Sequence, residues 1–211
     1  MSDWTQAKHN LDLPDTNFEE IRELYRSQIE LPHSKPIKKF LLCPVGIVGA
    51  GKTTVVKPLS SRLGLARVST DEIRKILKEK GFNYNRVREL AFSIAKELVE
   101  RGYGVAVDAN CGSDKSREEI KEFQTKYGIR VVWIHVDPPE SFIVNKLEKY
   151  KHDWLFKDGD EAVEAYFKYK EKYGDFKNLG LPYSYIFDTS GNDLNEQINE
   201  AVNIIKNLEN N

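Results

Sequence analysis

Residues 43–54 read CPVGIVGAGKTT and decide the fold. Gly46, Gly51, Lys52 and Thr53 fit the pattern G-x-x-x-x-G-K-[ST]. An apolar run precedes this stretch and a helical pattern follows it, which is the context that a phosphate-binding loop requires. Glycines let the backbone turn tightly and direct N–H groups toward phosphate oxygens. The residues predicted to bind the nucleotide are Gly46, Gly49, Ala50, Gly51, Lys52, Thr53 and Thr54.

Two side chains of this loop have predicted roles beyond the backbone. Lys52 would reach the β- and γ-phosphates of ATP, and the Thr53 hydroxyl would hold Mg²⁺. The N-terminus of the following helix would add its partial positive charge to the site. A chance match to the pattern is the alternative, and the flanking strand and helix argue against it.

The composition limits the class of protein. The chain has 211 residues, of which 40% are hydrophobic and 31% charged, as in one soluble domain of ordinary size. The formal net charge of −1 gives no support to binding nucleic acid through bulk charge, although a local basic groove stays open. Cys43 and Cys111 have neither disulfide-framework nor metal-ligand spacing. With no signal peptide or membrane span in the pattern, a cytoplasmic location is expected and a membrane partner is not.

The rest of the chain alternates strands and helices. Strands are predicted at 39–45, 66–69, 104–108, 130–136 and 184–188, with helices at 53–63, 71–80, 84–101, 114–127, 139–150, 160–172 and 193–208. Continuous apolar strands joined by helices indicate an α/β fold, with a parallel sheet covered on both faces. Ligands bind such a sheet beyond the carboxyl ends of its strands.

The first 36 residues are expected to form a tail and an appended helix. Residues 18–30 place apolar side chains along one stripe, and Thr16 and Glu19 have the spacing of a capping box. The main domain would then comprise residues 37–211.

Residues 69–76, STDEIRKI, follow the second strand. Ser69 and Glu72 can form a capping box, and Asp71 suits the first turn of a helix, which is a purely structural interpretation. The functional interpretation is that Asp71 accepts the proton of a hydroxyl attacking the γ-phosphate. Arg74 would lie on the same helical face and bind an anionic group of the acceptor.

Asp108 ends the third strand, and Asn110 follows it. A carboxylate in this place commonly acts as the second partner of the Mg²⁺ in a phosphate-binding loop. A helix cap is the alternative, but Ser113 can supply that cap. Asn110 could form a hydrogen bond with the acceptor.

The segment from about 145 to 172 is predicted to form a helical lid. Its candidate cations are Lys146, Lys149, Lys151 and Lys157, and Lys149 is the one assigned to the substrate. For most of these lysines a solvated helix face is the simpler interpretation. Aromatic residues at 166, 167, 169 and 173 are expected to pack. The turn at 188–191 could lie against the nucleotide base.

The series GIVGAGKTT, STDEIRK, VAVDAN and HVDPPE…NKL resembles the P-loop kinases, in particular the polynucleotide 5′-kinases and the zeta-toxin-like kinases. The resemblance covers about residues 37–208, so residues 37–211 would be a P-loop kinase domain. It implies a five-stranded parallel sheet in the order 2-3-1-4-5. It also implies that Asp71 is the general base and that Arg74 binds an acceptor phosphate. Asn145 and the lid lysines depart from the family, which commonly places arginines there.

Two functions remain open from the sequence. The first is a kinase that uses ATP and Mg²⁺ to phosphorylate a hydroxyl, on a sugar, nucleoside or sugar nucleotide or on a nucleic acid 5′ end. The near-neutral charge favours the small acceptor. The second is a nucleotide-binding regulatory ATPase without a small acceptor, although neither a guanine-specifying N-K-x-D motif nor a water-positioning glutamine is evident.

Overall fold

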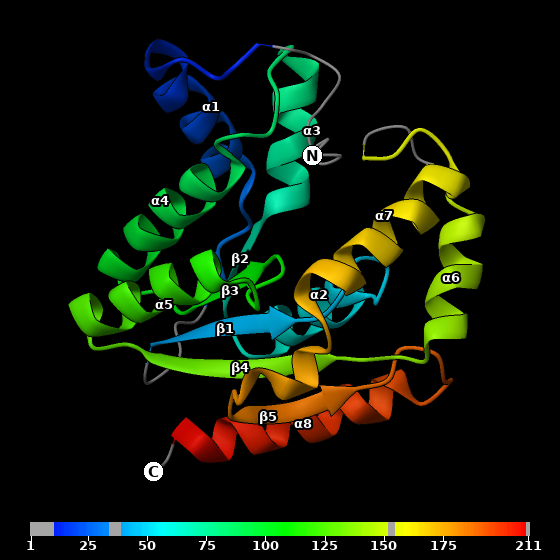
Figure 1. Cartoon of the computed structure of the whole chain (residues 1–211). Helices are drawn as coiled ribbons and strands as arrows, with labels where there is room; N and C mark the ends of the chain where they lie inside the picture. The colour runs from blue at the N-terminus through cyan, green and yellow to red at the C-terminus, as the bar shows by residue number, and fades with distance from the viewer. Residues whose placement is uncertain (1–10, 34–38, 152–154, 210–211) are drawn as a thin grey trace.

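The computed structural model describes residues 11–33, 39–151 and 155–209. Five parallel strands form one sheet in the order β2-β3-β1-β4-β5, which confirms the predicted order (Figure 1). The strands are β1 (Phe40–Val45), β2 (Ala66–Ser69), β3 (Val105–Asp108), β4 (Arg130–Val136) and β5 (Tyr183–Phe187).

Helices lie where the apolar periodicity predicted them, with ends that differ by up to three residues. They are α1 (Asp15–Gln28), α2 (Lys52–Arg62), α3 (Thr70–Glu79), α4 (Val87–Glu100), α5 (Asp114–Tyr127), α6 (Glu140–Glu148), α7 (Gly159–Tyr173) and α8 (Leu194–Glu209). A short 3₁₀ helix, Phe176–Leu179, was not predicted. Within the described residues, none of the helices has the length and apolar character needed to span a bilayer.

The alternation along β1 shows why its sequence is apolar throughout. Leu41 and Cys43 point into a core built with α4 and α5, together with α1 and α3. Phe40 and Leu42 point the other way, into a core built with α2 and α8. Because helices cover both faces, every side chain of this strand is buried.

Helix α1 packs against α3 and α4 at one edge of the molecule (Figure 1). Ile21 and Tyr25 are each only 1% exposed and belong to the core. The predicted capping box is wrong, because α1 begins at Asp15 with Pro14 in the capping position and no side chain caps it. The Thr16 hydroxyl instead donates to Asn17 beside it.

Candidate active site

The phosphate-binding loop connects β1 to α2, and close backbone packing determines its shape. Gly51 stands at the start of α2 with φ of 93°, a conformation that residues with a side chain rarely adopt. A Cβ at Gly46 would lie 2.6 Å from the carbonyl oxygen of Val136 in β4. No side chain caps α2. The first N–H groups of this helix therefore suit an anion such as a phosphate.

Lys52 folds back over the loop. Its Nζ donates to the carbonyl oxygens of Gly46, at 3.0 Å, and Ile47, at 2.8 Å. Burial lowers the pKa of Lys52 to about 8, although the nearby carboxylates of Asp71 and Asp108 oppose this shift. The ammonium group is thus held at the loop by carbonyl oxygens, which a phosphate oxygen could replace.

Thr53 and Asp108 meet at the carboxyl end of β3. The Thr53 hydroxyl donates to Asp108 Oδ1 at 3.1 Å, and Arg67 Nε donates to Asp108 Oδ2 at 2.9 Å. Asp108 is only 3% exposed. Burial raises the pKa of Asp108, and the charge and hydrogen bond of Arg67 oppose this effect.

This pair fits a magnesium ion. Mg²⁺ prefers oxygen ligands and is commonly bound by one or two protein groups together with substrate phosphates and water. Among the described residues, no group of three or more His, Cys, Asp or Glu side chains could form a metal cage. Thr53 and Asp108 therefore have the chemistry for a Mg²⁺ that a nucleotide also ligates.

Asp71 and Arg74 lie together on the first turns of α3. Arg74 Nη1 donates to Asp71 Oδ1 at 2.6 Å and to Thr70 Oγ1 at 3.1 Å. Ser69 caps the helix by accepting from the Glu72 N–H, as predicted. The Glu72 carboxylate does not complete a capping box, because it accepts from Tyr25 and Arg67 instead.

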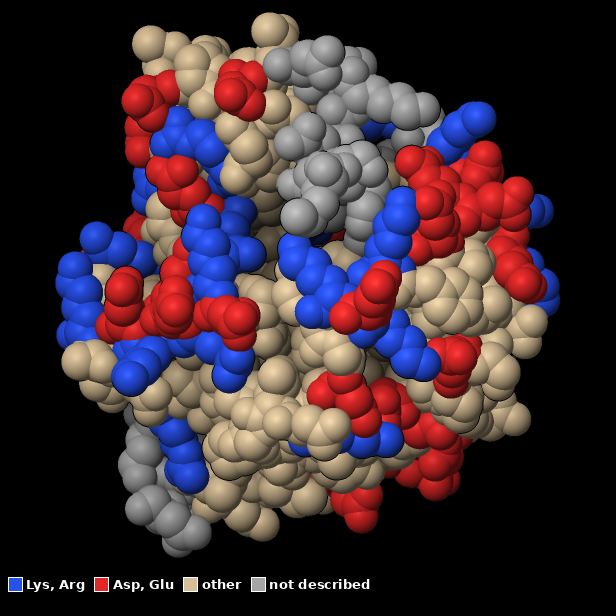
Figure 2. Space-filling view, viewed as in Figure 1, with Lys and Arg blue, Asp and Glu red and all other residues tan. Residues whose placement is uncertain are grey.

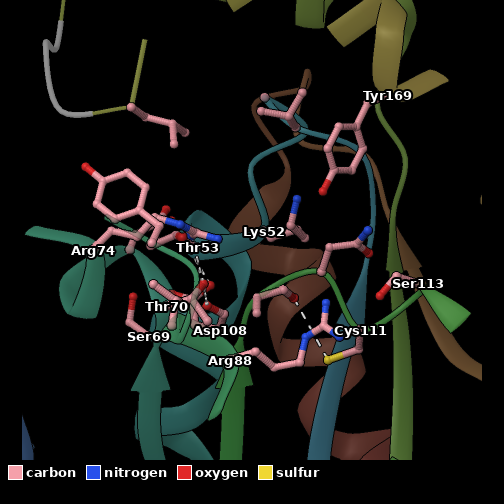
Figure 3. Close-up of a pocket in the computed structure, with 18 of the residues that line it drawn as sticks. Lys52, Thr53, Ser69, Thr70, Arg74, Arg88, Asp108, Cys111, Ser113 and Tyr169 are labelled. Carbon is pink, nitrogen blue, oxygen red and sulfur yellow. Dashed lines mark hydrogen bonds and ion pairs between the residues drawn. The ribbon is translucent and has the colours of Figure 1, made fainter. Parts of the chain in front are cut away.

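One cavity of about 1830 Å³ joins these groups (Figure 3). Its lining includes most of the predicted site residues, namely Gly49, Gly51, Lys52, Thr53, Thr54, Asp71, Arg74, Asp108, Asn110 and Lys149. Gly46 and Ala50 are not part of the lining. Asn110 contacts the phosphate-binding loop, since its Oδ1 accepts from Gly46 N at 3.4 Å and from Gly112 N at 3.1 Å.

The structure adds cations that the sequence analysis did not assign to the site. Arg67 contacts Asp108 from within β2, and Arg88 reaches the cavity from α4. Among the described residues, Arg88 Nη1 is buried without a hydrogen-bond partner. Neither arginine directly follows a strand, so the rule that located Asp71 and Asp108 could not find them.

The lid contributes a further cation. Helices α6 and α7 pack together, and Lys146 Nζ donates to the Gly49 carbonyl at 3.3 Å. Partial burial lowers the pKa of Lys146. Lys149 and Lys151 line the cavity, whereas Lys157 does not. Figure 2 shows Lys and Arg side chains around the hollow on this face.

The aromatic residues of α7 contact one another in ring pairs, Tyr166 with Phe167 and Tyr169 with Tyr173, although not all of them are buried. Tyr166 is buried, but Phe167 is 48% exposed. Tyr169 lines the cavity (Figure 3). The turn after β5 does lie against the phosphate-binding loop, because Thr189 Oγ1 donates to the Ala50 carbonyl at 2.8 Å. Its contact with a base stays a prediction.

A curated protein resembles part of this chain. The bifunctional shikimate kinase/3-dehydroquinate synthase of Thermotoga maritima is 30% identical over 152 residues, which cover 64% of this chain and 28% of that protein. The chain thus spans less than a third of the length of this relative.

Solved structures share the fold. A presumed kinase from Chloroflexus aurantiacus has a TM-score of 0.64 at 16% identity, over 81% of this chain and 98% of that one. The APS kinase of Mycobacterium tuberculosis, in complex with AMPPNP and APS, has a TM-score of 0.51 at 17% identity, over 81% and 99%. At these identities the likeness establishes the fold of small P-loop kinases.

The AAA domain model (AAA_33) matches residues 41–168, which is more than half of the chain and runs from β1 into the lid. The loop, the Asp71 helix and Asp108 all lie inside this match, whereas α1 lies outside it. The chain therefore belongs to the AAA domain family and has a P-loop kinase fold.

Proposed function

We propose that this chain is an ATP-dependent kinase that transfers the γ-phosphoryl group to a hydroxyl of a small acceptor. The observation that carries the proposal is that donor-side and acceptor-side groups line the same cavity. Lys52, Thr53 and Asp108 lie on its donor side, and Asp71 and Arg74 lie on the facing helix. A nucleotide-binding site alone would not need a carboxylate–arginine pair opposite the phosphate-binding loop.

On the donor side, the loop amides and Lys52 would bind the phosphates of ATP. Thr53 and Asp108 would hold Mg²⁺, which supplies charge neutralisation for the transferring group when bound. Arg67 holds the second oxygen of Asp108 and leaves the first directed at Thr53. The lid lysine Lys146, already at the loop, would approach the phosphates from the other side.

On the acceptor side, Asp71 would accept the proton of the attacking hydroxyl. Arg74 and Arg88 both line the cavity there, and each has a buried nitrogen without a partner among the described residues. Such donors favour an acceptor that carries an anionic group. The Asn110 amide and Lys149 are further candidates for binding it. Shikimate and APS, named for two of the similar proteins, are small molecules, and this supports a small acceptor for this chain.

The test is a screen with γ-labelled ATP and Mg²⁺ over sugars, nucleosides, small hydroxy acids and 5′-hydroxyl oligonucleotides, followed by Asp71→Asn. We expect Asp71→Asn to lower kcat by about 10²- to 10⁴-fold, because the general base is lost. Its affinity for ADP should stay unchanged. Asp114→Asn is a matched control, since Asp114 also pairs with an arginine three residues on, at the start of α5.

One outcome would contradict the proposed kinase function, and another would contradict only the role of Asp71. If no acceptor in the panel becomes labelled while ATP is still hydrolysed, the regulatory ATPase becomes the better assignment. If transfer is found but Asp71→Asn and Asp114→Asn reduce it equally, the kinase function stands and the role of Asp71 as base fails.

A further inference from the structure

Tyr25 of α1 reaches the start of the helix that bears Asp71. Its hydroxyl accepts from the Ser69 N–H at 2.6 Å and donates to Glu72 Oε2 at 3.2 Å. Burial raises the pKa of Tyr25, so the hydroxyl remains a donor at ordinary pH. Because the hydroxyl satisfies a buried backbone N–H at the end of β2, it ties α1 to the point where β2 becomes α3.

The contact continues to the proposed metal site. Glu72 Oε1 accepts from Arg67 Nη1 at 2.8 Å, and Arg67 Nε donates to Asp108 Oδ2 at 2.9 Å. The other oxygen of Asp108 accepts from Thr53. The planar guanidinium group therefore connects two carboxylates in a defined geometry. A continuous chain of hydrogen bonds runs from α1 to the pair that would hold Mg²⁺.

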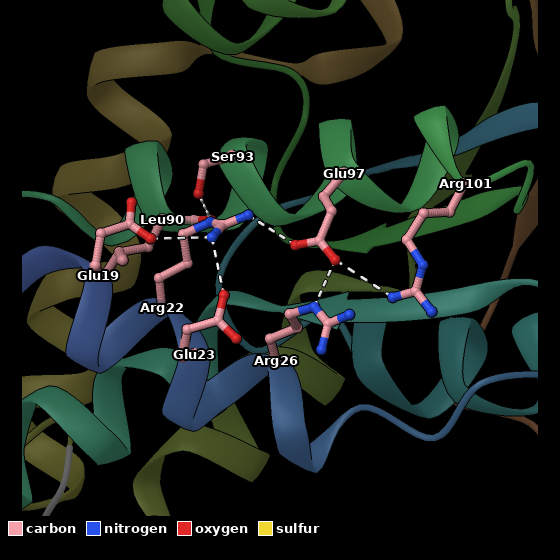
Figure 4. A network of polar contacts seen from close by, with 8 residues as sticks. All are labelled: Glu19, Arg22, Glu23, Arg26, Leu90, Ser93, Glu97 and Arg101. Atoms are coloured by element: carbon pink, nitrogen blue, oxygen red, sulfur yellow. Dashed lines mark hydrogen bonds and ion pairs between the residues drawn. The ribbon is translucent and has the colours of Figure 1, made fainter.

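Helix α1 is anchored independently of Tyr25. Glu97 of α4 pairs with Arg22 and Arg26 of α1, and also with Arg101 at the end of α4 (Figure 4). Ile21 is buried in the core beside them. These contacts fix the position of α1, and therefore of Tyr25, relative to β2 and α3.

We propose that Tyr25 is a positioning residue, which orients Asp108 toward Mg²⁺ through Glu72 and Arg67 and holds the start of the Asp71 helix. The proposal rests on the proposed function for the role of Asp108. It adds that α1, outside the family match, completes the metal site rather than merely covering the core. Outer contacts of this kind commonly change metal affinity or activity by 10- to 100-fold.

The test compares Tyr25→Phe with Tyr185→Phe. Tyr185 is a suitable control because it also donates to a glutamate, Glu200, away from the cavity. Calorimetry gives the affinity for ADP with and without Mg²⁺, and the ratio measures how strongly the metal supports binding. We expect Tyr25→Phe to reduce this ratio by about tenfold while metal-free ADP affinity changes less than about twofold. Tyr185→Phe should leave the ratio unchanged.

A second variant keeps the proposal testable if Tyr25→Phe does not fold properly. Glu72 is partly exposed on α3, and Glu72→Gln keeps an oxygen for Tyr25 while removing the charge that faces Arg67. We expect it to reduce the Mg²⁺ ratio in the same direction, and the double variant to be no worse than the stronger single one, because both act through one chain.

The proposal fails if Tyr25→Phe lowers the Tm but leaves the Mg²⁺ ratio and kcat at wild-type values, since a structural role alone predicts that result. It also fails if the two variants have additive effects. A wild-type chain that binds MgADP but phosphorylates no acceptor would overturn the kinase function only, because the binding ratio needs no acceptor.

Discussion

The two sides of the cavity are held in place by different means. The phosphate-binding loop is shaped by its own backbone, with glycines at positions that a side chain would strain or block. The α3 side is held by side chains of other elements, above all Tyr25 of α1 and Arg67 of β2. A short motif can therefore specify the first side, whereas the second depends on how α1, β2 and β3 come together.

The largest effect expected on the loop side comes from the loss of the Lys52 cation. Lys52→Met should lower kcat by about 10²- to 10³-fold, because it removes the cation that would stabilise the transferring phosphoryl group. Lys121→Met is the control, since this lysine lies on the outer face of α5. The measurement is steady-state transfer, with the Tm checking the fold. Equal activity in the two variants would show that the loop does not act catalytically.

A second prediction for the loop side concerns how the free energy of unfolding depends on pH. In the folded, unliganded chain the pKa of Lys52 is lowered to about 8, from 10.5. Between these values the unfolded chain binds a proton that the folded chain lacks, so this contribution to the free energy of unfolding rises with pH. It should be absent from Lys52→Met, which urea titrations at pH 7.5 and 9.5 can compare.

The affinity for nucleotide should fall as the pH rises, which is opposite to the effect on the free energy of unfolding. Phosphates beside Lys52 favour its charged form, so ADP binding above pH 8 should take up a proton and weaken by about tenfold per pH unit. Calorimetry in buffers of different ionisation enthalpy measures the uptake. Proton uptake that persists in Lys52→Met would assign it to another group.

The smallest expected effect is on the α3 side of the cavity, from the ion pairs that hold α1. Glu97→Gln removes partly exposed ion pairs between α1 and α4 and should lower the free energy of unfolding by about 1 kcal/mol. Transfer and the Mg²⁺ ratio should stay at wild-type values, because Tyr25 keeps its partners. Urea denaturation and the ADP titrations measure both. A reduced Mg²⁺ ratio would mean that the whole docking of α1, rather than the Tyr25 hydroxyl, supports the metal site.

Much of the site was predictable because it follows a simple rule. Asp71 follows β2 and Asp108 ends β3, and parallel strands bring their carboxyl ends to one edge of the sheet. Arg67 lies inside β2, where a single sequence offers no reason to expect a contact with Asp108. Arg88 and Tyr25 lie on helices whose orientation depends on packing. The predicted capping box at Thr16 was wrong because α1 already begins at Asp15, after Pro14 and the buried Leu13.

The sequence by itself determined the elements and the phosphate-binding loop, because these depend on local periodicity and on glycine geometry. The sheet order was implied by the resemblance to the P-loop kinases, and the structure confirms it. Only the tertiary structure decided which cations meet at the cavity and that α1 is connected to Asp108. Those contacts join residues 5 to 47 positions apart in sequence. No local pattern encodes them, since they arise when helices pack on a completed sheet.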